Sequence, residues 1–126
     1  MNIQCEVSLG ELVDKISILK IKMEKIKDTS KTDLVLSEYK ALNKTLEELR
    51  LSGIENYLSK LQKINTELWE IEDDIRECEK RSDFSSQFIS LARSVYITND
   101  QRFAVKNEVN NKYGSSMKEV KSYEEY

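Results

Sequence analysis

The stretch IENYLSKLQKINTELWEIEDDIREC, residues 54–78, decides the fold class of this chain. Its apolar side chains alternate spacings of three and four residues, which places them on one face of a helix: Ile54, Tyr57, Leu61, Ile64, Leu68, Ile71, Ile75 and Cys78. A pattern that lasts for more than three heptads is typical of a coiled-coil-like seam. A long amphipathic helix is therefore the first element that the sequence predicts.

The segments before this helix have the same periodicity. Ser8 and Glu11 have capping-box spacing, with Glu11 expected to reach back, and they begin a helix whose apolar face contains Leu9, Leu12, Ile16, Leu19, Met23 and Ile26. A shorter second helix follows, with Val35, Tyr39, Leu42, Leu46 and Leu49. Ser52 and Glu55 repeat the capping-box spacing around Gly53, so we expect an αα-hairpin turn there. A helix that continues through Gly53 is the alternative.

The last helical segment contains charged residues where apolar ones are expected. Its apolar residues before Gly114 are Phe84, Phe88, Leu91, Val95, Val109 and Tyr113. In an unbroken helix, the polar residues Asn99, Arg102 and Lys106 would share the sector of Phe88, Val95 and Tyr113. Thr98 and Gln101 also have capping-box spacing, so the helix could instead stop and restart there. Arg102 and Lys106 would then lie over the rim of the core with their charged ends in water.

We therefore predict an all-α fold, an antiparallel helical bundle with three long helices and one shorter one. Residues 1–114 form the bundle, and residues 115–126 form a C-terminal tail that is docked or disordered. Ile18 and Ile21 lie on a second face of the first helix, which a neighbouring helix or a second copy would cover. A homodimer is compatible with this pattern.

Composition excludes several classes of function. The 126 residues carry a net charge of −3 with lysines spread along the chain, which gives no basic face for nucleic acid. No apolar run approaches the ~20 residues that span a membrane, and the N-terminus is unlike a signal peptide, so we expect a cytoplasmic protein. The chain has no histidine and only two distant cysteines, which removes the common zinc sites and the histidine-dependent nucleophiles. We expect no cofactor and no metal.

A second polar line lies beside the apolar face of residues 54–78. It contains Asn65, Trp69, Glu72, Arg76 and Glu79 at spacings of four, three, four and three. One interpretation is a solvated flank of ion pairs such as Glu72 with Arg76, each contributing a few tenths of a kcal/mol. Trp69 could pack at the edge of the core, or its flat face could cover a ligand or a cation.

Four segments together carry a family resemblance: EVSLGELVDKISILKIK, LWEIEDDIRECE, FISLARSVYITNDQRFAVKNEVN and YGSSMKEVKSY. In this order they resemble a family of small bacterial and phage proteins of unknown function, similar to genes near glycan-assembly glycosyltransferases. The family pattern falls on Glu11, Asp14, Lys15, Trp69, Glu72, Asp73, Arg76, Arg93, Tyr96, Asn99, Asp100, Arg102, Lys106, Asn110, Lys121 and Tyr123. Residues 28–58 depart most from it, so the second helix is expected to be a spacer.

The family pattern coincides with the charged sector and with the polar line. Arginine and lysine in a partly desolvated cleft bind phosphate or carboxylate, and asparagine and tyrosine can orient a sugar or a base. We predict a polar inter-helix site for an anionic ligand, with Arg76, Arg102 and Lys106 as clamps and Glu72 or Asp14 as the orienting carboxylate. The full predicted set is Arg76, Asn99, Arg102, Lys106, Glu72, Trp69, Tyr96, Asn110, Asp14 and Lys15.

Two further classes of function remain open. The chain could be an interaction module that docks on a protein partner, such as a glycosyltransferase-like protein, through its helices and its tail. It could also be an enzyme acting on a phosphorylated metabolite, a nucleotide sugar or a nucleotide. A metal-dependent phosphohydrolase is the weakest form of that alternative, because the carboxylates of ELWEIEDDIRECE, residues 67–79, point around the helix and not to one side.

Overall fold

The computed structural model describes all of residues 1–126 and contains four α-helices and no β-strand. The helices are α1 (Leu9–Lys25), α2 (Thr29–Glu48), α3 (Ile54–Lys80) and α4 (Ser86–Lys112). The all-α class is thereby confirmed. The prediction that the second helix is the short one is wrong, because α2 has 20 residues and α1 has 17.

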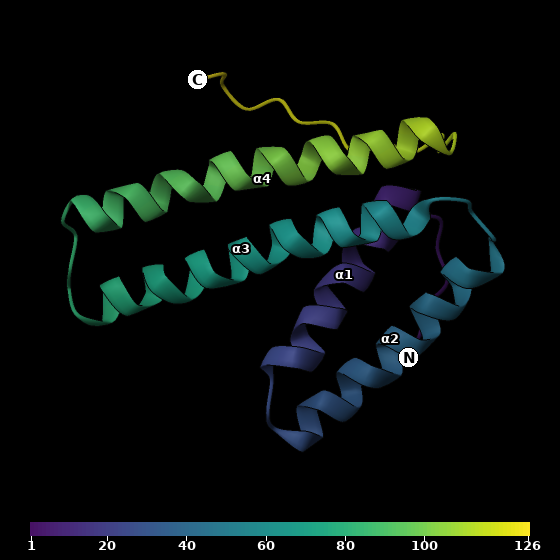
Figure 1. Cartoon of the computed structure of the whole chain (residues 1–126), viewed down its shortest axis with the longest axis horizontal. Helices are drawn as coiled ribbons and strands as arrows, with labels where there is room; N and C mark the ends of the chain where they lie inside the picture. Colours follow the sequence, from purple (N-terminus) through teal and green to yellow (C-terminus); the bar gives the residue numbers. More distant parts are fainter.

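Helix α1 is the element that joins the others. Figure 1 shows α3 and α4 lying antiparallel and side by side, while α1 crosses them at an angle and α2 runs back along α1. The backbone of α1 approaches all three other helices, whereas the backbone of α2 approaches only α1. The turn at Gly53 therefore separates α2 from α3 and does not pack them into a hairpin. The far ends of α3 and α4 extend beyond α1 (Figure 1).

The hydrophobic core lies where α1 crosses the α3–α4 pair. Each helix contributes apolar residues to it: Val13, Ile16, Leu46, Ile54, Leu61, Val105 and Val109. Burial of such a side chain stabilises the fold by roughly 1.5–3 kcal/mol. Ile21 is also buried within the chain, so this residue of the second face of α1 needs no second copy to cover it.

The capping box predicted at Ser8 and Glu11 is half right, and the one predicted at Ser52 and Glu55 is wrong. The Ser8 hydroxyl accepts a hydrogen bond from the Glu11 backbone N–H at 3.2 Å, but the Glu11 carboxylate binds another helix instead of reaching back. Helix α3 begins after Gly53, whose φ of 80° makes the turn, and no side chain caps it. The turn is therefore confirmed, and the helix does not continue through Gly53.

Helix α4 is continuous from Ser86 to Lys112, so of the two alternatives left open by the sequence the unbroken helix is the one observed. Thr98 is buried inside the helix and does not cap a new one. Phe84 precedes the helix and is 56% exposed, so it is not part of the apolar face. The charged residues that follow Thr98 are consequently carried inward by one uninterrupted helix.

The chain reverses direction after α4. Gly114 has a φ of 70°, and the Ser115 N–H donates to the Asn110 carbonyl at 2.8 Å, which is the bond of a Schellman motif. Residues 115–126, called the tail below, contain no regular secondary structure and run back along α4 (Figure 1). The turn brings tail residues next to the middle of α4.

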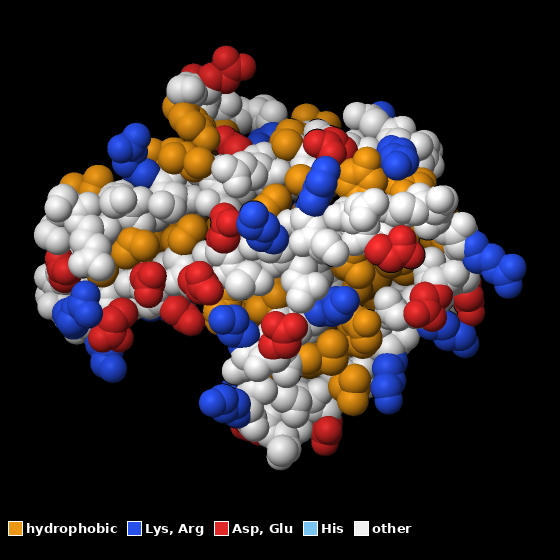
Figure 2. Space-filling model, viewed as in Figure 1, with side chains coloured by type: hydrophobic (Ala, Val, Ile, Leu, Met, Phe, Trp, Pro, Cys, Tyr) orange, Lys and Arg blue, Asp and Glu red, His pale blue; other side chains and the backbone are white.

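The surface is mixed in charge. Figure 2 shows acidic and basic side chains interspersed over the visible face, with apolar surface between the helices. None of the four helices combines the length and the apolar character needed to cross a membrane.

Candidate functional site

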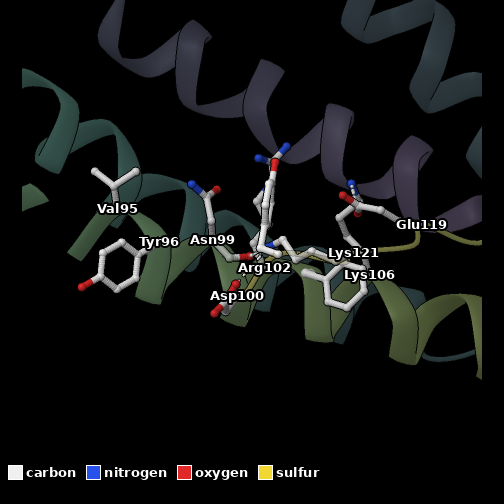
Figure 3. Close-up of a pocket in the computed structure, with 10 residues that line it drawn as sticks. Val95, Tyr96, Asn99, Asp100, Arg102, Lys106, Glu119 and Lys121 are labelled. Carbon is white, nitrogen blue, oxygen red and sulfur yellow. Dashed lines mark hydrogen bonds and ion pairs between the residues drawn. The ribbon is translucent and has the colours of Figure 1, made fainter. Parts of the chain in front are cut away.

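A buried ion pair joins α1 to α4. Arg102 Nε donates to Asp14 Oδ1 at 2.9 Å, and Arg102 Nη2 donates to Asp14 Oδ2. This bidentate geometry is the strongest form of an arginine–carboxylate contact. The Asp14 side chain is only 3% exposed, and that of Arg102 is 29% exposed. In Figure 3 the Arg102 side chain points from α4 towards α1.

Helix α3 fixes the same carboxylate from a third direction. Asn65 Nδ2 donates to Asp14 Oδ1 at 2.9 Å and to Ser17 Oγ at 2.8 Å. The Ser17 hydroxyl in turn donates to the Asp14 backbone carbonyl at 2.6 Å. We call Asp14, Ser17, Asn65, Arg102 and Lys106 the polar centre. Its hydrogen bonds hold Asp14 in a single position between three helices.

Lys106 completes the polar centre and is surrounded by carboxylates. Its side chain is 5% exposed, and its Nζ lies 2.6 Å from Glu11 Oε1, 2.9 Å from Glu119 Oε2 and 4.0 Å from Asp14 Oδ2. The Glu119 contact is an ion pair by distance, but Oε2 is shielded from solvent without the angles of a hydrogen bond. Glu119 belongs to the tail, so the tail supplies one of the anions that face Lys106.

The two cations are held in their charged forms. Burial lowers the pKa of Lys106, but the contacts with Glu11 and Glu119 outweigh it and leave the pKa above its usual value. The hydrogen bonds to Asp14 raise the pKa of Arg102, against the opposing effect of burial. Both side chains therefore remain positive at neutral pH, and the stability that the raised pKa values represent is lost as the pH rises through them.

Gly10 lets the start of α1 touch the backbone of α4. Its N–H donates to Asn110 Oδ1 at 2.7 Å, and a Cβ at this position would lie 2.7 Å from the Lys106 carbonyl oxygen. Asn110 is fully buried, and its Nδ2 has no hydrogen-bond partner. Only glycine permits this approach, which sets the distance between Asp14 and the cations of α4.

A cavity of about 330 Å³ lies between α4 and the tail, and we call it the tail cavity. Arg102 and Lys106 line it from α4, and Glu119 and Lys121 line it from the tail (Figure 3). The tail is held there by Asp100, which accepts hydrogen bonds from Tyr126 at 2.6 Å and from Lys121 at 3.0 Å. These two bonds, that of Tyr126 first, lower the pKa of Asp100.

A second cavity of about 660 Å³ lies between α1, α3 and α4, and we call it the Trp69 cavity. Trp69, Glu72 and Arg76 line it from α3, while Ile18 and Ile21 of α1 contribute apolar surface. Asn99 and Arg102 line both cavities. The polar sector of α4 therefore forms a common border between them.

The structure places most of the predicted site residues around these cavities. Asp14, Arg102 and Lys106 are in contact, and Tyr96 and Asn99 line the tail cavity. Asp14 holds the Arg102 side chain by hydrogen bonds, whereas Glu72 pairs with Arg76 at the surface. Two predicted residues lie elsewhere: Lys15 pairs with Glu38 of α2 at 3.0 Å, and Asn110 binds Gly10.

Sequence reasoning missed Ser17, Asn65 and Glu119 as parts of the site. The spacing of three between Asp14 and Ser17 and the place of Asn65 in the polar line were available signals. Glu119 had none, because periodicity says nothing about an irregular segment. No three or more cysteine, aspartate and glutamate side chains are grouped as a metal ion requires.

The fold and this geometry define a class: an all-helical protein with a charged, hydrogen-bonded centre at a helix crossing and a tail folded over it. The chain belongs to the family described as "family of unknown function (DUF6165)", which matches residues 3–126. Comparison with curated proteins and with solved structures gave no match.

Proposed function

We propose that the protein is a ligand-binding module and that its tail cavity takes an anionic small molecule beside Lys106 and Arg102. One observation carries this proposal: a carboxylate from an irregular segment, that of Glu119, already lies 2.9 Å from the nearly buried Lys106 ammonium. A position next to a buried cation that accepts one carboxylate from the solvent side can accept another anion. The ligand would enter by taking the place of Glu119.

Glu119 is a replaceable occupant because its fit is incomplete. Its Oε2 is enclosed without a hydrogen bond of good geometry, and the covalent link to the tail limits how it can turn. A free phosphate or carboxylate has no such link. Asp14 uses two of the five N–H groups of Arg102, which leaves three that a ligand could contact.

Charge balance supports an exchange of anions. Without Glu119, Arg102 and Lys106 keep Asp14 and Glu11 as partners, and a bound anion would restore the negative charge that Glu119 supplied. Release of the tail breaks the partly buried pair of Lys121 with Asp100 and the hydrogen bond from Tyr126 to Asp100, in addition to the Glu119 contact. A bound anion must therefore contribute more than these tail contacts do together, which a doubly charged phosphate can do through Lys106 and Arg102.

Isothermal calorimetry and thermal unfolding with pyrophosphate test this proposal. Pyrophosphate should stabilise the wild-type protein by RT ln(1 + [L]/Kd), about 2.7 kcal/mol at a hundredfold excess over Kd. Glu119→Gln should bind it more tightly, because the competing charge is gone, and Lys106→Met should not bind it. Glu124→Gln is the matched control, since Glu124 is exposed and makes no ion pair.

Two outcomes would contradict the proposal. One is a wild-type protein that does not respond to pyrophosphate. The other is a Glu119→Gln variant with the same affinity as Glu124→Gln, because the ligand would then not compete with Glu119. This second comparison does not depend on Lys106→Met, whose folding could suffer from the stranded carboxylates.

A second candidate function, a protein-interaction module, has an observation of its own. The outer part of the α3–α4 pair extends beyond α1, with Ile89 56% exposed and Ile97 38% exposed on one face of α4. Residues 67–83 contain eight acidic and three basic residues, which favours a basic partner surface. The family resemblance suggests a glycosyltransferase-like partner, and a second copy of the chain is the other occupant to consider.

The double variant Ile89→Asp, Ile97→Asp tests the interaction candidate. It should lose association with a purified glycosyltransferase, or self-association in light scattering, and keep the response to pyrophosphate. An unchanged mass of the wild-type protein at all concentrations, with or without that partner, would remove this candidate.

The link to glycan assembly and the enzymatic alternative are also proposals. The link rests on the family resemblance, and the alternative rests on that resemblance together with the charges of the site. A cytoplasmic location belongs to the same proposal, because nucleotide sugars and sugar phosphates are the compounds that both would require. Turnover of these compounds, followed by phosphorus NMR, would separate an enzyme from a binding module.

A further inference from the structure

Trp69 is the only tryptophan of the chain, and it lies outside the hydrophobic core. It is half-buried at the Trp69 cavity, where α3 leaves the crossing with α1. The aromatic pairs of the chain are formed by tyrosine and phenylalanine alone, so the indole ring has no aromatic partner. A large flat ring beside a cavity is an unused stacking surface.

The other walls of the Trp69 cavity suit a flat, polar-edged ring. Ile18, Ile21 and Leu68 provide apolar contact, which a bare anion would not use. The side-chain amide of Asn99 carries two donors and an acceptor, as the edge of a nucleobase requires, and it is not engaged by another side chain. Arg76 lies on the outer side, in an exposed pair with Glu72.

The two cavities adjoin along α4. Asn99 and Arg102 line both, and Asn99 and Lys106 are seven residues apart, about 10 Å along the helix axis. A ligand with a ring at one end and a phosphate at the other could therefore contact Trp69 and Lys106 together. Arg102 would lie between its two parts.

We propose that the Trp69 cavity is a subsite for the base of a nucleotide whose phosphate lies in the tail cavity against Arg102 and Lys106. This inference rests on the proposed anion site, to which it adds the class of ligand. The base stacks on Trp69, the Asn99 amide forms hydrogen bonds with the edge of the base, and the phosphate takes the place of the Glu119 carboxylate. The tail, which borders only the phosphate part, does not limit entry of the base.

The fluorescence of Trp69 tests the subsite directly, because no other tryptophan contributes. Uridine diphosphate should quench the emission and bind at least about tenfold more tightly than pyrophosphate. Pyrophosphate should bind with little change in emission, and glucose 1-phosphate should bind no better than pyrophosphate. These three probes separate the base from the phosphate and from a sugar ring.

The substitution Trp69→Leu, measured by calorimetry, tests the stacking contact. It should weaken the binding of uridine diphosphate by about fivefold to about a hundredfold, the range observed when a base loses its aromatic partner. The affinity for pyrophosphate should not change. Phe84→Leu is the matched control, since Phe84 is an exposed aromatic residue that lines neither cavity. The wild-type fluorescence titration needs no variant, so it remains decisive if Trp69→Leu does not fold.

Each outcome has a defined meaning. Two results would overturn the base subsite and leave the anion site standing. One is equal affinity for uridine diphosphate and pyrophosphate, and the other is tight nucleotide binding without a change in the emission of Trp69. Glucose 1-phosphate binding as tightly as the nucleotide would overturn it in favour of a sugar subsite. No binding of any of the three compounds would overturn the anion site as well.

Discussion

The two halves of α4 differ in what they bury and what they expose. The inner half, residues 98–112, contains every buried residue of the helix, including Lys106 and Asn110. The outer half, residues 86–97, contains no buried residue and exposes Ile89 and Ile97. One continuous helix thus places a charge inside the protein and apolar side chains at its surface, the reverse of the usual distribution.

Neither half of α4 is arranged as the stability of the fold alone would favour. A buried ion pair often stabilises a protein no better than well-packed apolar residues of similar size would. The inner half nevertheless holds two cations against three carboxylates, Glu11, Asp14 and Glu119. The outer half leaves apolar surface uncovered. We infer that function, and not stability, explains both departures.

The largest expected effect on stability separates two arginine–carboxylate pairs: the buried pair of Arg102 with Asp14 and the exposed pair of Arg76 with Glu72. Asp14→Asn leaves Arg102 without its charge partner and should lower the free energy of unfolding by about 3 kcal/mol. Glu72→Gln acts on the exposed pair with Arg76 and should change it by less than about 0.5 kcal/mol. Urea unfolding of both variants gives the values. Equal effects would mean that the polar centre is not a buried network.

A smaller loss is expected where the inner half meets α1. Alanine in place of glycine inside a helix usually gains about 1 kcal/mol, but the added methyl of Gly10→Ala would lie 2.7 Å from the Lys106 carbonyl. The overlap should outweigh the gain and lower the free energy of unfolding by about 2 kcal/mol. Gly114→Ala is the comparison, because nothing lies within 4 Å of its Cβ and only backbone strain opposes it. A stabilised Gly10→Ala protein would show that the two helices are not in contact there.

The smallest effect concerns the tail. The pKa of Asp100 is lowered by its bonds to Tyr126 and Lys121, so these contacts contribute fully above the usual carboxyl value of about 3.9 and are lost as the pH falls through the lowered value. The tail should therefore detach in acid before the helices unfold. NMR signals of the Tyr126 ring report this, and Asp100→Asn should resemble the detached state at neutral pH. Ring signals that change only with global unfolding would contradict the assignment.

The helices and the inward direction of the charged residues could be predicted from the sequence, whereas their partners could not. Spacing placed Ile54 to Cys78 on one face of α3 and pointed Arg102 and Lys106 inward, because a side chain's direction follows from position along a helix. Periodicity does not say which helix lies opposite. Lys15 follows Asp14 in the chain, yet it points about 100° further round α1 and meets α2.

The position of the tail and the crossing of α1 with α4 could not be predicted from local sequence patterns. Capping-box spacing at Thr98 and Gln101 suggested a break, but tertiary burial of Thr98 kept the helix continuous. The contact of Gly10 with Lys106 is set by the packing of two distant segments, and Glu119 is positioned by the turn at Gly114. Neither the Gly10–Lys106 contact nor the position of Glu119 produces a periodic pattern in the sequence.

The bonds of the polar centre also determine when it can form during synthesis. The hydrogen bonds from Arg102 and Lys106 to α1 join residues 88 and 95 positions apart in a chain of 126 residues. Helices α1 to α3 can be complete on the ribosome while Asp14 still lacks its arginine. Contacts of such long range form late and slow folding, because a large loop must close first. A chaperone or a ligand that acts on this protein would therefore find its centre open until α4 has been synthesised.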